Sequence, residues 1–110
     1  MAFTTVTGSN GVTSLVGTSG IDVATIVTLA SNVFVGAQAA NDTITVALAT
    51  GGNVVTGYTV NGGAGDDAIT FNSSLLGSTV NGDGGAGTAG NDILTFNQIV
   101  INSAVAAGSG

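Results

Sequence analysis

Residues 59–71 read Thr-Val-Asn-Gly-Gly-Ala-Gly-Asp-Asp-Ala-Ile-Thr-Phe, and this stretch decides the predicted fold. A β-prone segment leads into a run of glycines, and a second segment then alternates between two kinds of side chain. Glycine adopts the positive φ angles that tight turns require, whereas alternation with a period of two is typical of strands. The stretch therefore predicts two strands joined by a glycine-rich turn, with Asp67 at the start of the second strand.

The second half of this stretch recurs along the chain. Each copy has an aspartate, any residue, a small or aliphatic residue, a threonine and a large apolar residue; the copies are Asp22–Ile26, Asp42–Val46, Asp67–Phe71 and Asp92–Phe96. A valine followed by Gly or by Asn-Gly precedes every copy. Repeats of about 20–25 residues are typical of solenoid coils. The sequence therefore predicts an all-β fold, a parallel β-solenoid (β-roll or β-helix) of about four irregular 20–25-residue coils.

The alternation within each copy also predicts which side chains form the core. The third and fifth residues of a copy should point inward, and the fourth should form an outer column of threonines, a residue type that suits a solvated strand face. Further strands are expected at 32–35, 54–60 and 78–80. Stacked in this way, the strands predict two parallel sheets with a narrow core between them.

The length of 110 residues predicts a single domain, 1–110. Within it we distinguish an N-terminal strand or assembly segment (1–14), the repeats (15–97) and a C-terminal strand or assembly segment (98–110). The terminal segments are apolar and β-prone, and the chain contains no Lys or Pro to guard exposed strand edges. We therefore expect the ends to pair with other copies, giving a homo-oligomer or an open head-to-tail polymer.

Composition excludes several classes of function. The chain has no Lys, Arg, His or Cys, and its six acidic residues give a net charge of −6. Without cations it cannot neutralise phosphates, so nucleic-acid binding is not expected. Without His or Cys, ordinary zinc, iron and copper sites and the usual nucleophilic triads are missing. No apolar run is long enough to span a bilayer, so membrane insertion is not expected.

The acidic residues suggest a cation site instead. Residues 62–70 match the nonapeptide G-G-x-G-x-D-x-U-x at every fixed position, and oxygen-only ligands favour Ca²⁺. An ion between the turns Gly63–Asp67 and Asp83–Asp92 would take oxygens from two coils; the candidate ligands are the carboxylates of Asp66, Asp67, Asp83 and Asp92 and the carbonyls of Gly63 and Gly65. Asp22 and Asp42 are interpreted as turn-forming residues, since Gly-Asp is also a plain turn signal.

With these motifs the chain resembles the RTX (haemolysin-type) calcium-binding repeat family of bacterial surface and secreted proteins. The resemblance covers residues 57–96 well and 15–50 weakly, and the long irregular spacers depart from the family pattern. It implies a parallel β-roll, calcium in the turns, and type I secretion to the exterior or cell surface. The expected absence of a cleavable N-terminal signal agrees with that route.

These observations predict a secreted, calcium-stabilised structural protein that self-assembles head-to-tail into a filament or surface layer. The alternative is a monomeric calcium-binding RTX-like adhesin module, attached to the cell surface. An enzyme is not expected, because Asp66 and Asp67 should point to opposite faces and no Glu, His, Lys or Arg could assist them. Ice binding would need a regular Thr-x-Thr array, and of the four repeats only Asp42–Val46 provides one, with Thr43 and Thr45.

Overall fold

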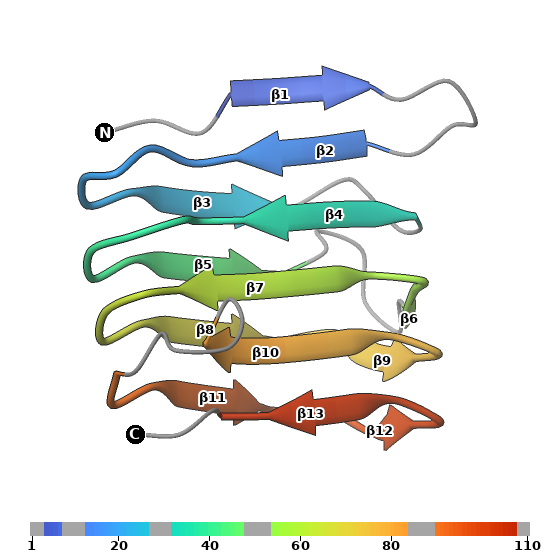
Figure 1. Ribbon diagram of the computed structural model, residues 1–110. Helices are drawn as coiled ribbons and strands as arrows, with labels where there is room; N and C mark the ends of the chain where they lie inside the picture. Colours follow the sequence, from blue (N-terminus) through green and yellow to red (C-terminus); the bar gives the residue numbers. More distant parts are fainter. Residues whose placement is uncertain (1–3, 8–12, 27–31, 48–53, 84–89, 108–110) are drawn as a thin grey trace.

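The computed structural model describes residues 4–7, 13–26, 32–47, 54–83 and 90–107, and these form thirteen β-strands and no helix (Figure 1). The strands are β1 (Thr4–Thr7), β2 (Thr13–Val16), β3 (Val23–Ile26), β4 (Val33–Gly36), β5 (Thr43–Val46), β6 (Val54–Thr56), β7 (Thr59–Gly63), β8 (Ala68–Phe71), β9 (Ser74–Leu76), β10 (Thr79–Asp83), β11 (Ile93–Phe96), β12 (Val100–Ile101) and β13 (Ala104–Ala106). In this part of the chain there is consequently no helix that could cross a membrane.

The strands form three sheets. Sheet A has the order β1-β2-β4-β7-β10-β13, sheet B the order β11-β8-β5-β3 and sheet C the order β12-β9-β6. Every pairing is parallel except that of β1 with β2, which is antiparallel. The chain passes repeatedly from A to B to C, and we call each pass a coil: coil 1 contains β2 and β3, coil 2 β4–β6, coil 3 β7–β9 and coil 4 β10–β12. The prediction of an all-β fold with parallel sheets is confirmed.

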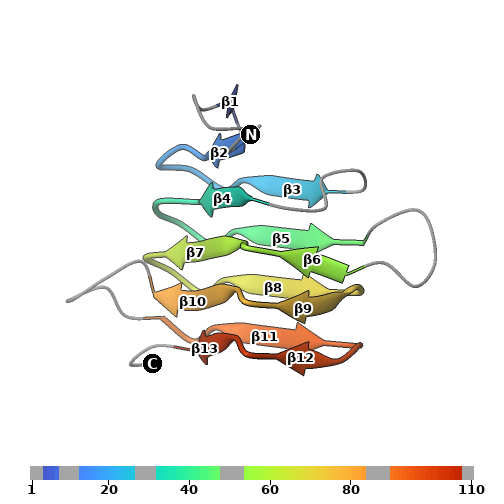
Figure 2. The same cartoon turned by 90° about the vertical axis from the view of Figure 1, so that its right-hand side faces the viewer.

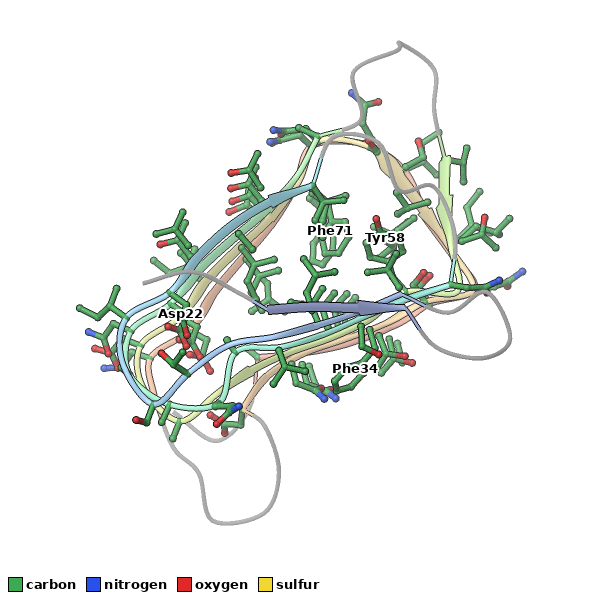
Figure 3. The ribbon with its side chains drawn as sticks, turned by 90° about the horizontal axis from the view of Figure 1, so that it is seen from above. Asp22, Phe34, Tyr58 and Phe71 are labelled. Atoms are coloured by element: carbon green, nitrogen blue, oxygen red, sulfur yellow. The ribbon has the colours of Figure 1, made fainter. Side chains whose placement is uncertain are left out.

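The prediction of two sheets is wrong, because the coils have three sides. Seen along the stack, the sheets lie along the sides of a triangle (Figure 3). The expected strand 54–60 is divided into β6 and β7 at Gly57, which has a φ of 67°. Gly77, with a φ of 58°, separates β9 from β10 in the next coil. A residue with a positive φ bends an extended chain, so these two glycines form the corners between β6 and β7 and between β9 and β10. The arrangement is compatible with a β-helix.

Equivalent residues of successive coils stack in register. Ile44 pairs with Ile69, and Val60 pairs with Val80. The third and fifth residues of the repeats point inward as predicted, and the rings of Phe71 and Phe96 stack with centroids 5.5 Å apart and planes 10° apart. The buried side chains form one hydrophobic cluster inside the triangle. The outer column of threonines is confirmed, and consists of Thr25, Thr45, Thr70 and Thr95.

The two ends of the stack differ. At the N-terminal end β1 pairs with β2 of the same chain, and the inward-facing Ile26 of coil 1 is only 3% exposed. At the C-terminal end β11, β12 and β13 lie side by side at the bottom of the stack (Figure 2), and Val100 and Val105 are 39% and 44% exposed. At the N-terminal end, β2 therefore already has a partner strand from the same chain. At the C-terminal end, the edges of the last strands lie beside exposed apolar side chains.

Candidate functional site: a buried aspartate ladder

The aspartates of the four repeats stack at the corner between sheets A and B. The backbone N–H of each donates to Oδ1 of the aspartate in the next coil; the donor–acceptor distances are 2.7 Å from Asp22 to Asp42, 2.8 Å from Asp42 to Asp67 and 2.9 Å from Asp67 to Asp92. Asp22, Asp42 and Asp67 are 0%, 1% and 2% exposed. Figure 3 shows Asp22 in this corner of the triangle. We call these four residues the aspartate ladder.

The ladder gives the early aspartates a second role beside turn formation. Asp22 does hold its own turn, because it accepts a hydrogen bond from the N–H of Thr18 at 2.5 Å. Asp42, however, links coil 1 to coil 2 in the same way as Asp67 links coil 2 to coil 3. The sequence concealed this equivalence because the turn before Asp42 has lost its glycines. Gln38 and Ala40 nevertheless keep positive φ angles of 83° and 86°.

Small residues make room for the carboxylates. Gly62 is the last residue but one of β7 and lies opposite Asp67, and a Cβ built on it would overlap both Asp67 Oδ2 and the carbonyl oxygen of Gly82. A Cβ on Gly82 would likewise overlap Asp92 Oδ2 and the carbonyl oxygen of Ala107. The space left by each glycine is therefore bordered by a carboxylate oxygen and a backbone carbonyl oxygen, and we call this space a cradle.

Several carboxylate oxygens in the cradles receive no hydrogen bond. Within the described ranges, Oδ2 of Asp42, of Asp67 and of Asp92 are buried atoms without a hydrogen-bond donor. Burial raises the pKa of Asp42 and of Asp92, and it raises the pKa of Asp67 to about 6. Neighbouring acidic groups contribute to this rise in the pKa of Asp67, and the hydrogen bond from the Asp42 N–H opposes it. The ladder thus favours a bound proton or a bound cation over bare charge.

Asp83 adds a second carboxylate to the last step of the ladder. It ends β10, pairs in register with Gly63, and its side chain is in hydrogen-bonding contact with the Asp92 carboxylate. Ionised carboxylates only accept hydrogen bonds, so two of them in contact need either a shared proton or a cation between them. The structure therefore brings together Asp67, Asp83 and Asp92 of the predicted ligand set.

Asp66 is not brought into this group. It is exposed on the outer side of the turn, where its N–H donates to Asn41 Oδ1 and its own Oδ1 accepts from the Asn91 N–H, both at 2.9 Å. Neighbouring residues of an extended segment point to opposite faces, so Asp66 and Asp67 belong to separate columns. This outer ladder was not predicted, although an Asn or Asp precedes the aspartate in three of the four repeats.

Gly63 and Gly65 contribute through their backbone shape. Their φ angles are 108° and 127°, which side chains rarely permit. The carbonyl oxygen of Gly65 points toward the next coil, because a Cβ built on Gly90 would overlap it. The two glycines therefore let consecutive turns stack closely, and the Gly65 carbonyl lies between two coils. The role of the Gly63 and Gly65 carbonyls as ligands stays a prediction.

The donor set fits a hard cation. No group of three or more acidic side chains gathers tightly enough to hold a metal alone, as far as the chain is described. A cation at the last step would therefore be held by the carboxylates of Asp83 and Asp92, with backbone carbonyls and water completing its shell. An all-oxygen shell of this kind suits Ca²⁺, which takes six to eight oxygen ligands in flexible geometry.

Comparison with known proteins adds no relative. No family model matches the chain, and no curated protein and no solved structure shows a significant match. The site is therefore argued from its own geometry.

The ladder predicts an unusual response of the metal-free protein to pH. Because the pKa of Asp67 is about 6 when folded and 3.8 ordinarily, its stabilising contribution is complete below about pH 4 and is lost as the pH rises through 6. The difference corresponds to about 3 kcal/mol. Urea unfolding in chelator should therefore show stability increasing from pH 7.5 to pH 5. Asp67→Asn should flatten this slope, and a wild-type stability that falls steadily over the range would contradict the prediction.

Proposed function

We propose that the chain is a β-solenoid of about four three-sided coils that acts as a secreted structural protein stabilised by calcium. The in-register stacking of equivalent residues and the single core cluster inside three sheets support a continuous stack. The observation that carries the calcium assignment is the aspartate ladder, whose buried Oδ2 atoms lack donors in a chain that has no Lys, Arg or His.

Calcium would neutralise the ladder after export. Extracellular calcium modules bind with dissociation constants of about 10⁻⁴–10⁻³ M, and a ligand at about 100 times its dissociation constant stabilises the folded state by roughly 2.7 kcal/mol. This is a large share of the stability of a small domain. A chain that folds firmly only where calcium is abundant is suited to folding outside the cell, which supports an extracellular or cell-surface location and type I secretion.

Assembly through the ends of the stack completes the proposal. The C-terminal coil combines the edges of β11, β12 and β13 with exposed apolar side chains, and unprotected edges of this kind pair with other chains. Head-to-tail stacking into a filament or surface layer would cover them. The antiparallel pairing of β1 with β2 favours the alternative, a monomeric calcium-binding RTX-like adhesin module, since it supplies the N-terminal end with an internal partner.

Calcium should raise the thermal stability of the protein, and Asp92 should be required for this effect. We expect the melting temperature to rise by at least about 5 °C between chelator and 10 mM CaCl₂, because about 1 kcal/mol shifts a domain of this size by roughly 4–8 °C. Asp92→Asn should abolish the shift. Asp66→Asn is the matched control, since it removes the same charge from the outer ladder and should keep the shift. Equal melting temperatures with and without calcium in the wild type would refute calcium binding.

The two assembly forms are separated by electron microscopy and light scattering of the calcium-loaded protein. Filaments or sheets that dissolve in chelator support the structural proposal. A monomer of constant mass over a hundredfold range of concentration, stabilised by calcium, supports the adhesin module instead. Val105→Asp places a charge on the exposed C-terminal end and should block polymer growth, whereas Ile21→Asp, at an exposed position in coil 1, should leave it intact.

A further inference from the structure

One position in the corner turns differs in chemistry from coil to coil. In coils 3 and 4 it directly follows Gly62 and Gly82, the glycines that face the aspartate ladder. The strand register aligns the equivalent residues of the four coils, which are Thr18, Gln38, Gly63 and Asp83. We call it the switch position. The ladder itself repeats with the same residue in every coil, so differences between the corners arise mainly here.

In the first two coils the switch position supplies hydrogen-bond donors. Thr18 donates its N–H to Asp22 Oδ2 at 2.5 Å and its hydroxyl to the same carboxylate at 3.1 Å. Gln38 donates its side-chain amide to the carbonyl oxygen of Gly17 at 2.7 Å and so ties coil 2 to coil 1. Gln38 thus serves a carbonyl, and Asp42 Oδ2 is a buried atom without a donor in the described structure, whereas the Asp22 carboxylate has its donors within its own turn.

In the last coil the switch position supplies only acceptors. Asp83 places a carboxylate against Asp92, whose Oδ2 is buried without a donor. One coil earlier, Gly63 provides no side chain at all, and Asp67, which is 2% exposed, also has a buried Oδ2 without a donor in the described structure. The corners of coils 3 and 4 thus lack the donors that Thr18 supplies to the Asp22 carboxylate, and coil 4 has a second carboxylate in their place.

We propose that the switch position decides which coils need a cation, so that coil 1 folds without calcium and calcium orders coil 4 at the other end of the stack. This inference rests on the proposed binding of calcium and adds where it acts. Coil 4 carries β11 and β12 and leads into β13, the strands that show their edges at the C-terminal end. Calcium would thereby complete the end of the stack that is proposed to assemble.

Exchanging residues at the switch position tests this inference. In hydrogen-exchange mass spectrometry at pH 7.5, calcium should slow exchange in β11 and β12 at least tenfold while changing β3 less than twofold. Asp83→Thr transfers the donors of coil 1 to coil 4, so β11 and β12 should be protected in chelator and should no longer respond to calcium. Thr18→Asp is the reciprocal change, and it should make the protection of β3 depend on calcium.

The outcomes distinguish this inference from the proposed function. If calcium changes exchange in no peptide and no melting temperature, calcium binding itself is refuted. If calcium stabilises the protein but slows exchange equally in all coils, or if β11 and β12 of Asp83→Thr stay unprotected in chelator, calcium binding survives and the role of the switch position is overturned. Should Asp83→Thr fail to fold, a Thr18→Asp variant whose β3 is indifferent to calcium overturns it independently.

Discussion

Replacing Gly65 by alanine should destabilise the protein by about 2–6 kcal/mol. Its φ of 127° lies in a region that side chains rarely adopt, which costs on the order of 1–3 kcal/mol. The new Cβ would also overlap the carbonyl oxygen of Ala40 in the preceding coil, and that atom belongs to stacked backbone that cannot move alone. Overpacking of this kind adds about 1–3 kcal/mol. Urea unfolding followed by circular dichroism gives the difference directly.

Gly77→Ala is the matched control for this variant. Gly77 also has a positive φ, 58°, but a Cβ built there meets no atom within 4 Å. Its replacement should therefore cost only the conformational part, about 1–2 kcal/mol. The difference between the two variants measures how closely consecutive turns stack at the aspartate ladder. Equal losses for Gly65→Ala and Gly77→Ala would show that the turns are not in close contact.

Truncating Phe71 to alanine should cost about 3–5 kcal/mol, the range found for buried aromatic side chains. Phe71 has no exposed surface, stacks on Phe96, and meets Tyr58 edge to face with centroids 6.1 Å apart. Its removal leaves a cavity in the middle of the triangle that coils fixed by backbone hydrogen bonds cannot close. We expect a melting temperature lower by at least about 12 °C, or a chain that is unfolded at room temperature.

Phe34→Ala removes the same side chain from the outside of the stack. Figure 3 shows Phe34 on the outer side of sheet A and Phe71 inside the triangle. The ring lies close to Gly36 and is only partly covered, so its loss should cost less than about 1.5 kcal/mol. If Phe34→Ala proved as destabilising as Phe71→Ala, the assignment of inner and outer faces would be wrong.

The inner and outer faces were predictable because they follow from a local rule. In an extended chain every second side chain points the same way, so the repeat Asp67–Phe71 identified Ile69 and Phe71 as core residues before any contact was known. The glycine-rich nonapeptide likewise located the corner turn and Asp67. The third sheet was missed because it depends on single residues with a positive φ. Gly57 bends what otherwise reads as one strand, 54–60, and Gly77 separates β9 from the strand expected at 78–80.

The sequence predicted some residues of the candidate site but not how they are arranged. Asp67, Asp83 and Asp92 were chosen for their chemistry, and the structure places them together. The turn before Asp42 could not be identified from glycines, because Gln38 and Ala40 keep its backbone shape without them. The separation of Asp66 from Asp67 follows from the alternation of side chains along an extended segment. The hydrogen bonds of Asp66 with Asn41 and Asn91, however, depend on which turns are neighbours in the stack.

By itself, the sequence determined that this protein is an all-β stack of repeats with an acidic column and no internal cation, because periodicity and composition are properties of neighbouring residues. The tertiary structure alone decided that the coils have three sides, that four aspartates share one buried ladder, and that the last coil faces it with a second carboxylate. These features join residues that are 20–25 positions apart in the chain. Only the register between coils can bring such residues into contact.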